Sequence, residues 1–180
     1  ASFVGATFAD TQFLQVNLAG VDFTKSKFGF TEFTGSDLTG ANFSGMQLSR
    51  SVFSRSTLTD TNFSSVQADG IFITNSIGLR TNFSGAVIDN IQMGMNQMRN
   101  GDFTKARGVS GGFKYTTFDG SNFSDSNMKS ASFEYSGLTK TSFKNAHLEG
   151  TRLATAAVYD ANFNGAYLAA SELPTTYGYA

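Results

Sequence analysis

Residues that could carry out catalysis are scarce in this sequence. One histidine, His147, stands among 180 residues, and cysteine is absent. A triad of nucleophile, base and carboxylate would have to be built around that single imidazole. We interpret His147 as a solvated side chain, and we predict that the protein is not an enzyme.

Metal and phosphate chemistry have equally little support. MGMNQM, residues 93–98, offers thioethers of the kind that bind copper, but Met93 and Met98 also fall in the buried class of the repeat described below, where methionine commonly fills gaps. A zinc site commonly draws on three or four His or Cys ligands. GVSGGF, residues 108–113, lacks the Lys and Ser/Thr of a phosphate-binding loop. We therefore predict no metal and no cofactor.

The composition indicates a soluble globular chain with a weakly charged surface. Hydrophobic residues make up 40% and charged residues only 15% of the sequence, against about 25% charged in average proteins. No apolar run approaches the roughly 20 residues of a spanning helix, so we predict no membrane insertion. The first residues, ASFVG, do not resemble a secretion signal, although the initial Ala leaves open a removed targeting segment or a longer parent protein.

A five-residue period runs through the whole chain. From Phe3 onward every fifth residue is Phe, Leu, Met, Ile or Val, except at Ala68, Gly78, Gly108 and Gly178. The residue two positions earlier in each unit is usually Ala, Ser, Thr or Gly. None of the 13 basic and 14 acidic residues falls in either class. Two positions in every five are therefore expected to point inward.

Neither a helix nor a flat strand can carry this period. Five residues advance a helical side chain by about 140°, and an odd step on a strand alternates between its two faces. The chain must therefore turn once in every pentapeptide. Glycine is frequent at the fifth position, as at Gly20 and Gly40, where a bend benefits from its freedom at positive φ.

A second period of twenty residues defines the coil. One inward position in four holds Phe throughout, which predicts a coil of four sides with one face lined by stacked rings. With coils about 4.8 Å apart, roughly nine of them would form an all-β rod of roughly 40 Å. The predicted core ladder consists of Phe3, Phe23, Phe43, Phe63, Phe83, Phe103, Phe123, Phe143 and Phe163.

Several units resemble the consensus of the pentapeptide repeat family, a small residue followed by Asp or Asn, then Leu or Phe, then two variable positions. ANFSG at 41, TNFSG at 81, SNFSD at 121 and SDLTG at 36 are close matches. The resemblance implies a right-handed quadrilateral β-helix (solenoid) of 36 in-register pentapeptides. We assign residues 1–173 to this β-helix and residues 174–180 to a C-terminal cap or tail.

The middle of the chain departs from the consensus between residues 66 and 115. We predict that Ile71 and Ile91 fill the volume left by Ala68, Gly78 or Gly108, since interiors tolerate few voids. The alternative is that outward apolar side chains in and beside this region form a partner site. The candidate interaction surface comprises Phe72, Ile77, Leu79, Met95, Tyr115 and Tyr135.

The two ends need covers, because a solenoid leaves open edges. Near the C-terminus Pro174 interrupts the pattern, and nearby tyrosines form either a cap or a docking surface. These candidates are Tyr159, Tyr167, Tyr177 and Tyr179. At the N-terminus Phe3 is already in register, so either residues precede it or another chain covers it. Partners at an end would make the chain a homodimer or a subunit of an assembly.

Two functions fit these expectations. The first is a non-enzymatic scaffold that binds protein partners of unknown identity. The alternative, implied by the resemblance alone, is a DNA mimic that binds gyrase or another topoisomerase and protects it from quinolones. All four predicted faces are close to neutral, so we predict neither an acidic mimic face nor nucleic-acid binding. The resemblance admits a bacterial cytoplasm or periplasm, or a thylakoid lumen, and leaves the compartment unassigned.

Overall fold

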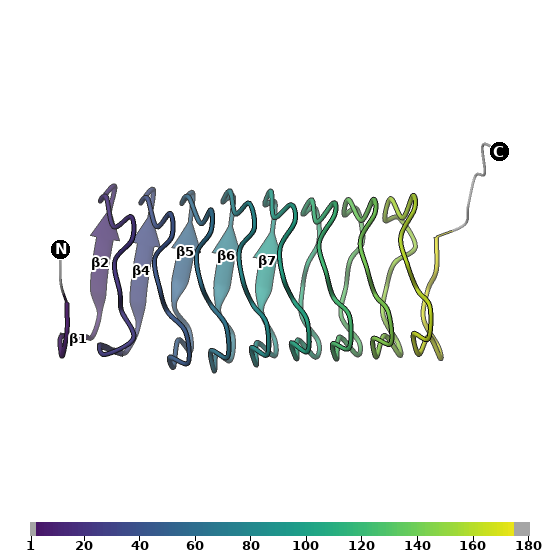
Figure 1. Cartoon of the computed structure of the whole chain (residues 1–180), viewed down its shortest axis with the longest axis horizontal. Coiled ribbons are helices and arrows are strands. Elements are labelled where there is room, and N and C mark those ends of the chain that lie inside the picture. Colours follow the sequence, from purple (N-terminus) through teal and green to yellow (C-terminus); the bar gives the residue numbers. More distant parts are fainter. Residues whose placement is uncertain (1–2, 175–180) are drawn as a thin grey trace.

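The computed structural model describes residues 3–174, which wind into a rod of stacked coils (Figure 1). Within this range there are strands, bridges and turns but no helix. The strands are β1 (Thr7–Phe8), β2 (Thr11–Leu14), β3 (Lys27–Phe28), β4 (Thr31–Thr34), β5 (Val52–Ser54), β6 (Phe72–Thr74) and β7 (Gln92–Gly94). The architecture is the predicted all-β solenoid.

Every strand pairing is parallel and joins residues twenty positions apart. β1 pairs with β3, and β2, β4, β5, β6 and β7 form one sheet in that order, side by side along the rod in Figure 1. In this sheet Phe33 pairs with Phe53, and Ile73 pairs with Met93. Isolated bridges continue the same offset as far as Arg152 and Glu172. The predicted twenty-residue coil is therefore confirmed.

Local hydrogen bonds explain the bend in many of the pentapeptides. The amide of Ala41 donates to the carbonyl of Leu38 at 2.9 Å, closing a turn whose third residue, Gly40, has a φ of 65°. A positive φ at that position is the requirement of a type II turn. The second residue of a unit adds a brace, as where Asn62 Oδ1 accepts from the amide of Ser64 at 3.0 Å. This brace gives a physical reason for Asn or Asp before the central Phe.

The phenylalanine ladder lies in the core as predicted. Ring centroids of successive members are 4.8 Å apart between Phe63 and Phe83 and 4.4 Å apart between Phe103 and Phe123, with the rings nearly parallel. Members from Phe23 to Phe143 are fully buried. Shorter ladders meet this one edge to face, as at Phe43 and Phe53, whose planes are 89° apart. Stacked and edge-to-face contacts are both favourable for aromatic rings.

The small inward residues hydrogen-bond to the preceding coil. Thr61 Oγ1 donates to the carbonyl of Leu38 at 2.8 Å, and Ser136 Oγ donates to that of Phe113 at 2.7 Å. These hydroxyls are buried, so each bond satisfies a polar group inside the core. Among the described residues the buried hydroxyls of Ser51 and Ser126 have no such partner.

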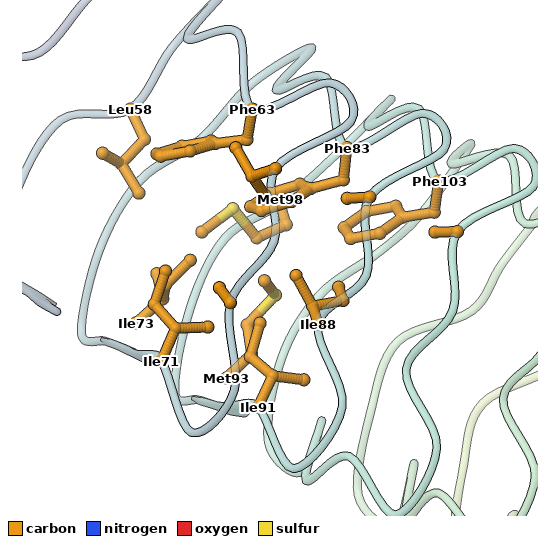
Figure 2. Packing of buried hydrophobic residues seen from close by; sticks show 14 of the residues in the cluster. Leu58, Phe63, Ile71, Ile73, Phe83, Ile88, Ile91, Met93, Met98 and Phe103 are labelled. Atoms are coloured by element: carbon orange, nitrogen blue, oxygen red, sulfur yellow. The ribbon is translucent and has the colours of Figure 1, made fainter. Parts of the chain in front are cut away.

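The irregular middle is filled differently from the prediction. Added Cβ atoms on Gly78 and Gly108 would collide with the sulfur atoms of Met98 and Met128, which come from the following coil. Ile91 instead lies beside Gly111, where its Cγ2 would be 3.0 Å from an added Cβ. Figure 2 shows Met98, Ile91 and their neighbours directed into the core. The volume at Gly78 and Gly108 is therefore filled by Met98 and Met128 from the next coil, contrary to the prediction for these two positions. The part of the prediction that concerns Ala68 stays a prediction.

Candidate interaction surface

Five of the six predicted surface residues are exposed. The exposed fraction is 64% for Met95, 55% for Tyr115 and Tyr135, 46% for Ile77 and 44% for Phe72. Leu79 is half-buried and lies in the turn of residues 79–80, two residues after Ile77. The exposed part of the candidate surface therefore excludes Leu79.

Met95, Tyr115 and Tyr135 occupy the same corner of three successive coils, which we call the Met-Tyr corner. The rings of Tyr115 and Tyr135 stack with centroids 4.9 Å apart and planes 3° apart. All three residues have a positive φ, of 58°, 58° and 61°. Gly, Asn and Asp adopt this conformation most readily, so a large apolar side chain is an uncommon occupant.

Phe72 and Ile77 flank the corner from its two sides. Phe72 points outward from β6, and Ile77 lies on the next side of the coil, where it forms a bridge with Gln97. Asn75, at the corner between them, lies next to Met95 of the following coil, because the Asn75 amide donates to the carbonyl of Gly94 at 3.3 Å. The exposed apolar residues therefore lie along one edge of the rod.

Gly94 leaves the backbone bare next to this edge. It immediately precedes Met95, and an added Cβ there would meet only the carbonyl oxygen of Lys114, at 3.6 Å. Gly112, which bridges to Gln92, is covered by the Gln92 side chain, whose Oε1 would be 2.8 Å from an added Cβ. The Met95 side chain therefore has no side chain beside it at the preceding residue.

Charged groups lie beyond the tyrosines on the same side. The Glu134 carboxylate contacts the Lys114 ammonium and lies 3.4 Å from Arg152 Nε. Hydrogen bonds from Lys114 and then Ser132 hold the pKa of Glu134 below its ordinary value. The Glu134 carboxylate thus pairs with two cations close to Tyr115 and Tyr135.

A second aromatic contact lies near the C-terminal end. Tyr167 stacks on His147 with ring centroids 4.4 Å apart, and Tyr159 is 72% exposed. His147 Nδ1 is 3.1 Å from Glu149 Oε1, which also lies 3.1 Å from Lys129 Nζ. Tyr177 and Tyr179, the other two cap candidates, lie outside the described residues.

Other chemistry was sought in the part of the chain that the structure describes. No group of three or more His, Cys, Asp or Glu residues is placed to hold a metal ion there. None of that part forms a helix long and apolar enough to cross a membrane. A concavity of about 310 Å³ over Ala68 is bordered by Asp69, Asp89 and two glutamines. Asp89 in this concavity is already paired with Arg107, 2.7 Å away.

Stacked parallel coils with a twenty-residue offset define a β-solenoid, and the family follows from its repeats. The profile of the family described as pentapeptide repeats (8 copies) matches residues 1–40, 36–75 and 113–145. The protein belongs to the pentapeptide repeat family. The interval between the last two matches contains Gly78 and Gly108, two of the central positions that depart from the repeat.

Two solved structures can be compared with this chain. The full-length structure of QnrB1, a plasmid-mediated fluoroquinolone resistance protein, is 17% identical over 95% of this chain and 88% of that one, with a TM-score of 0.62. HetL from the cyanobacterium Nostoc sp. strain PCC 7120 is 16% identical over 92% and 90%, with a TM-score of 0.28. The similarity to QnrB1 shows the shared fold. No curated protein matches the sequence.

Proposed function

We propose that this protein is a non-enzymatic scaffold that binds a protein partner through the Met-Tyr corner, with Phe72 and Ile77 at its sides. The observation that carries the proposal is the stacked and exposed pair Tyr115 and Tyr135. Tyrosine and methionine are enriched in protein interfaces, where charged residues are depleted from the centre. The rigid solenoid would present them at fixed spacing.

The geometry also favours binding energetically. Association costs less when interface side chains are already ordered, and the two tyrosine rings are held parallel before any partner arrives. Tyrosine supplies a large contact area with only two rotatable angles, and its hydroxyl can bond to a partner. The bare backbone at Gly94 gives a partner access to the Met95 end of the corner.

The test is a double variant, Tyr115→Ala with Tyr135→Ala, compared with a control, Tyr159→Ala with Tyr167→Ala, which removes the exposed tyrosines of the C-terminal cap or docking candidate. Both remove two exposed tyrosines, so a general loss of surface tyrosine affects them equally. Quantitative pull-down from native extract should show a protein that is lost with the first variant and retained with the control. Unchanged recovery of every bound protein by the first variant would refute the proposal.

A second candidate function is binding to gyrase or another type II topoisomerase. The shared fold with QnrB1, a fluoroquinolone resistance protein, favours it. The net charge of −1 argues against a strongly acidic mimic surface. A supercoiling assay with purified gyrase and a fluoroquinolone separates the two candidates, since inhibition or drug protection at stoichiometric protein would favour this second function.

A further inference from the structure

Met95 differs from every other methionine of the chain in its exposure. Met46, Met93, Met98 and Met128 are buried, with at most 6% of their surface exposed, whereas Met95 is 64% exposed. The difference follows from the repeat, because Met93 and Met98 occupy central inward positions and Met95 occupies a corner. A single residue, Gly94, thus separates the thioether of Met93 in the core from that of Met95 in solvent.

We propose that Met95 is a reversible oxidation site that responds to peroxides. In this reaction the O–O bond of hydrogen peroxide breaks and one oxygen forms a bond to the Met95 sulfur, giving the sulfoxide. The other oxygen leaves as water, so the sulfur loses two electrons and the peroxide gains them. Methionine sulfoxide is returned to the thioether by methionine sulfoxide reductases.

The surroundings of Met95 leave its sulfur open to a small oxidant. Gly94 offers no side chain to cover it, and the nearest atom to an added Cβ at Gly94 is a backbone oxygen 3.6 Å away. Met95 lies at the corner with a φ of 58° and is 64% exposed. A small oxidant can therefore reach the Met95 sulfur in the folded protein without the opening of a loop.

Oxidation would also change the proposed partner surface, a consequence that rests on the proposed function. A sulfoxide is polar, whereas a thioether is apolar. Met95 is the coil neighbour of Tyr115 in the Met-Tyr corner, and the bridge between Gln97 and Thr117 fixes that register. The oxidised protein would thus present a polar group at one end of its aromatic contact.

The decisive experiment treats the folded full-length chain with limiting hydrogen peroxide and follows each methionine by peptide mass spectrometry. Trypsin releases residues 81–99 as one peptide, which contains Met93, Met95 and Met98 and so carries its own controls. We expect Met95 to gain one oxygen at least about tenfold faster than the other two in the folded chain, and all three to react alike in denaturant. Equal rates in the folded chain would overturn the proposal.

A variant separates the oxidation site from its consequence for binding. Met95→Leu keeps an apolar side chain but cannot form a sulfoxide. Peroxide should weaken the Tyr115-dependent interaction of the native chain, sulfoxide reductase should restore it, and Met95→Leu should be insensitive. Undiminished binding after complete oxidation would overturn the regulatory consequence. If no interaction depends on Tyr115 and Tyr135, the proposed function fails, while the peptide rates still decide the oxidation site.

Discussion

Ser56 Oγ donates a hydrogen bond of 3.0 Å to the backbone carbonyl of Phe33 in the preceding coil. The same hydroxyl accepts from the amide of Ser36 at 3.2 Å. The small residue of the repeat is therefore more than a space filler, because its hydroxyl ties two successive coils together inside the core. Ser51 is also buried, and its hydroxyl has no partner.

This difference predicts opposite outcomes for two serine substitutions. Ser56→Ala leaves a buried amide and a buried carbonyl without their partner and should lower the free energy of unfolding by about 1–3 kcal/mol. Ser51→Ala removes a hydroxyl that is already unsatisfied and should be neutral or stabilising. Urea denaturation with unchanged slope measures both. Equal losses for the two variants would show that the hydrogen bond contributes nothing specific.

Truncating a central ring of the ladder should cost far more than truncating an exposed ring. Phe83 is fully buried between Phe63 and Phe103, so Phe83→Ala should lower the free energy of unfolding by about 3–5 kcal/mol through loss of burial and creation of a cavity. Phe72→Ala, at an outward position, should cost less than about 1 kcal/mol. Thermal or chemical denaturation of both variants decides, and a small loss at Phe83 would contradict its core position.

Two glycine-to-alanine substitutions test how closely the irregular middle is packed. A Cβ at Gly111 would lie 2.6 Å from the Phe113 ring and 3.0 Å from the carbonyl of Gly108, so Gly111→Ala should destabilise by about 1–3 kcal/mol. At Gly94 the nearest atom is 3.6 Å away, and Gly94→Ala should be neutral or mildly stabilising in strand β7. Comparable midpoints of unfolding would mean that the core at Gly111 relaxes freely.

Glu149 should make stability depend on pH in the acid range. Partial burial raises the pKa of its carboxyl, but hydrogen bonds from its own backbone amide, His147 and Lys129 outweigh this and lower the pKa to about 2 from an ordinary 4.5. Because the folded-state pKa is depressed, the stabilisation is complete above about pH 4.5 and is lost as the pH falls towards 2.

The check is to compare the native chain with Glu149→Gln in unfolding experiments between pH 6 and pH 2. The native chain should be the more stable of the two at pH 6, and the difference should shrink as the pH falls through this window. A difference that stays constant with pH would mean that the Glu149 carboxylate gains nothing from its neighbours.

The repeat made the coil, the ladder and the inward positions predictable from sequence. A period of five residues, with two positions in each unit that never hold a charged residue, is compatible with few folds. A period of twenty residues at Phe63, Phe83 and Phe103 specifies which rings stack. Such predictions need only the identity and spacing of residues.

Other features depend on contacts that spacing does not reveal. The hydroxyl of Ser56 reaches a carbonyl 23 residues away, and that distance appears only when the coil is built. Met98 fills the space at Gly78 because its side chain is long and flexible. The volume available there is known only once the coils are stacked. Leu79 is apolar and occupies an outward position like the other surface candidates, but in the turn at residues 79–80 it is half-buried, which spacing alone does not reveal.

The constant offset of twenty residues separates the length of the rod from the direction in which its features face. Removing residues 61–80 would delete one layer and leave every later column aligned with the earlier ones, because residue 81 takes the place of residue 61. Removing only five residues would preserve the pattern of inward and outward side chains. All residues after the deletion would, however, be shifted by one side of the four-sided coil. Phe3 and Phe23 would then no longer lie under Phe123, and Tyr115 would face a different direction. The length of the rod can therefore change in units of one coil, and the direction in which a surface faces can change in units of one side of the coil.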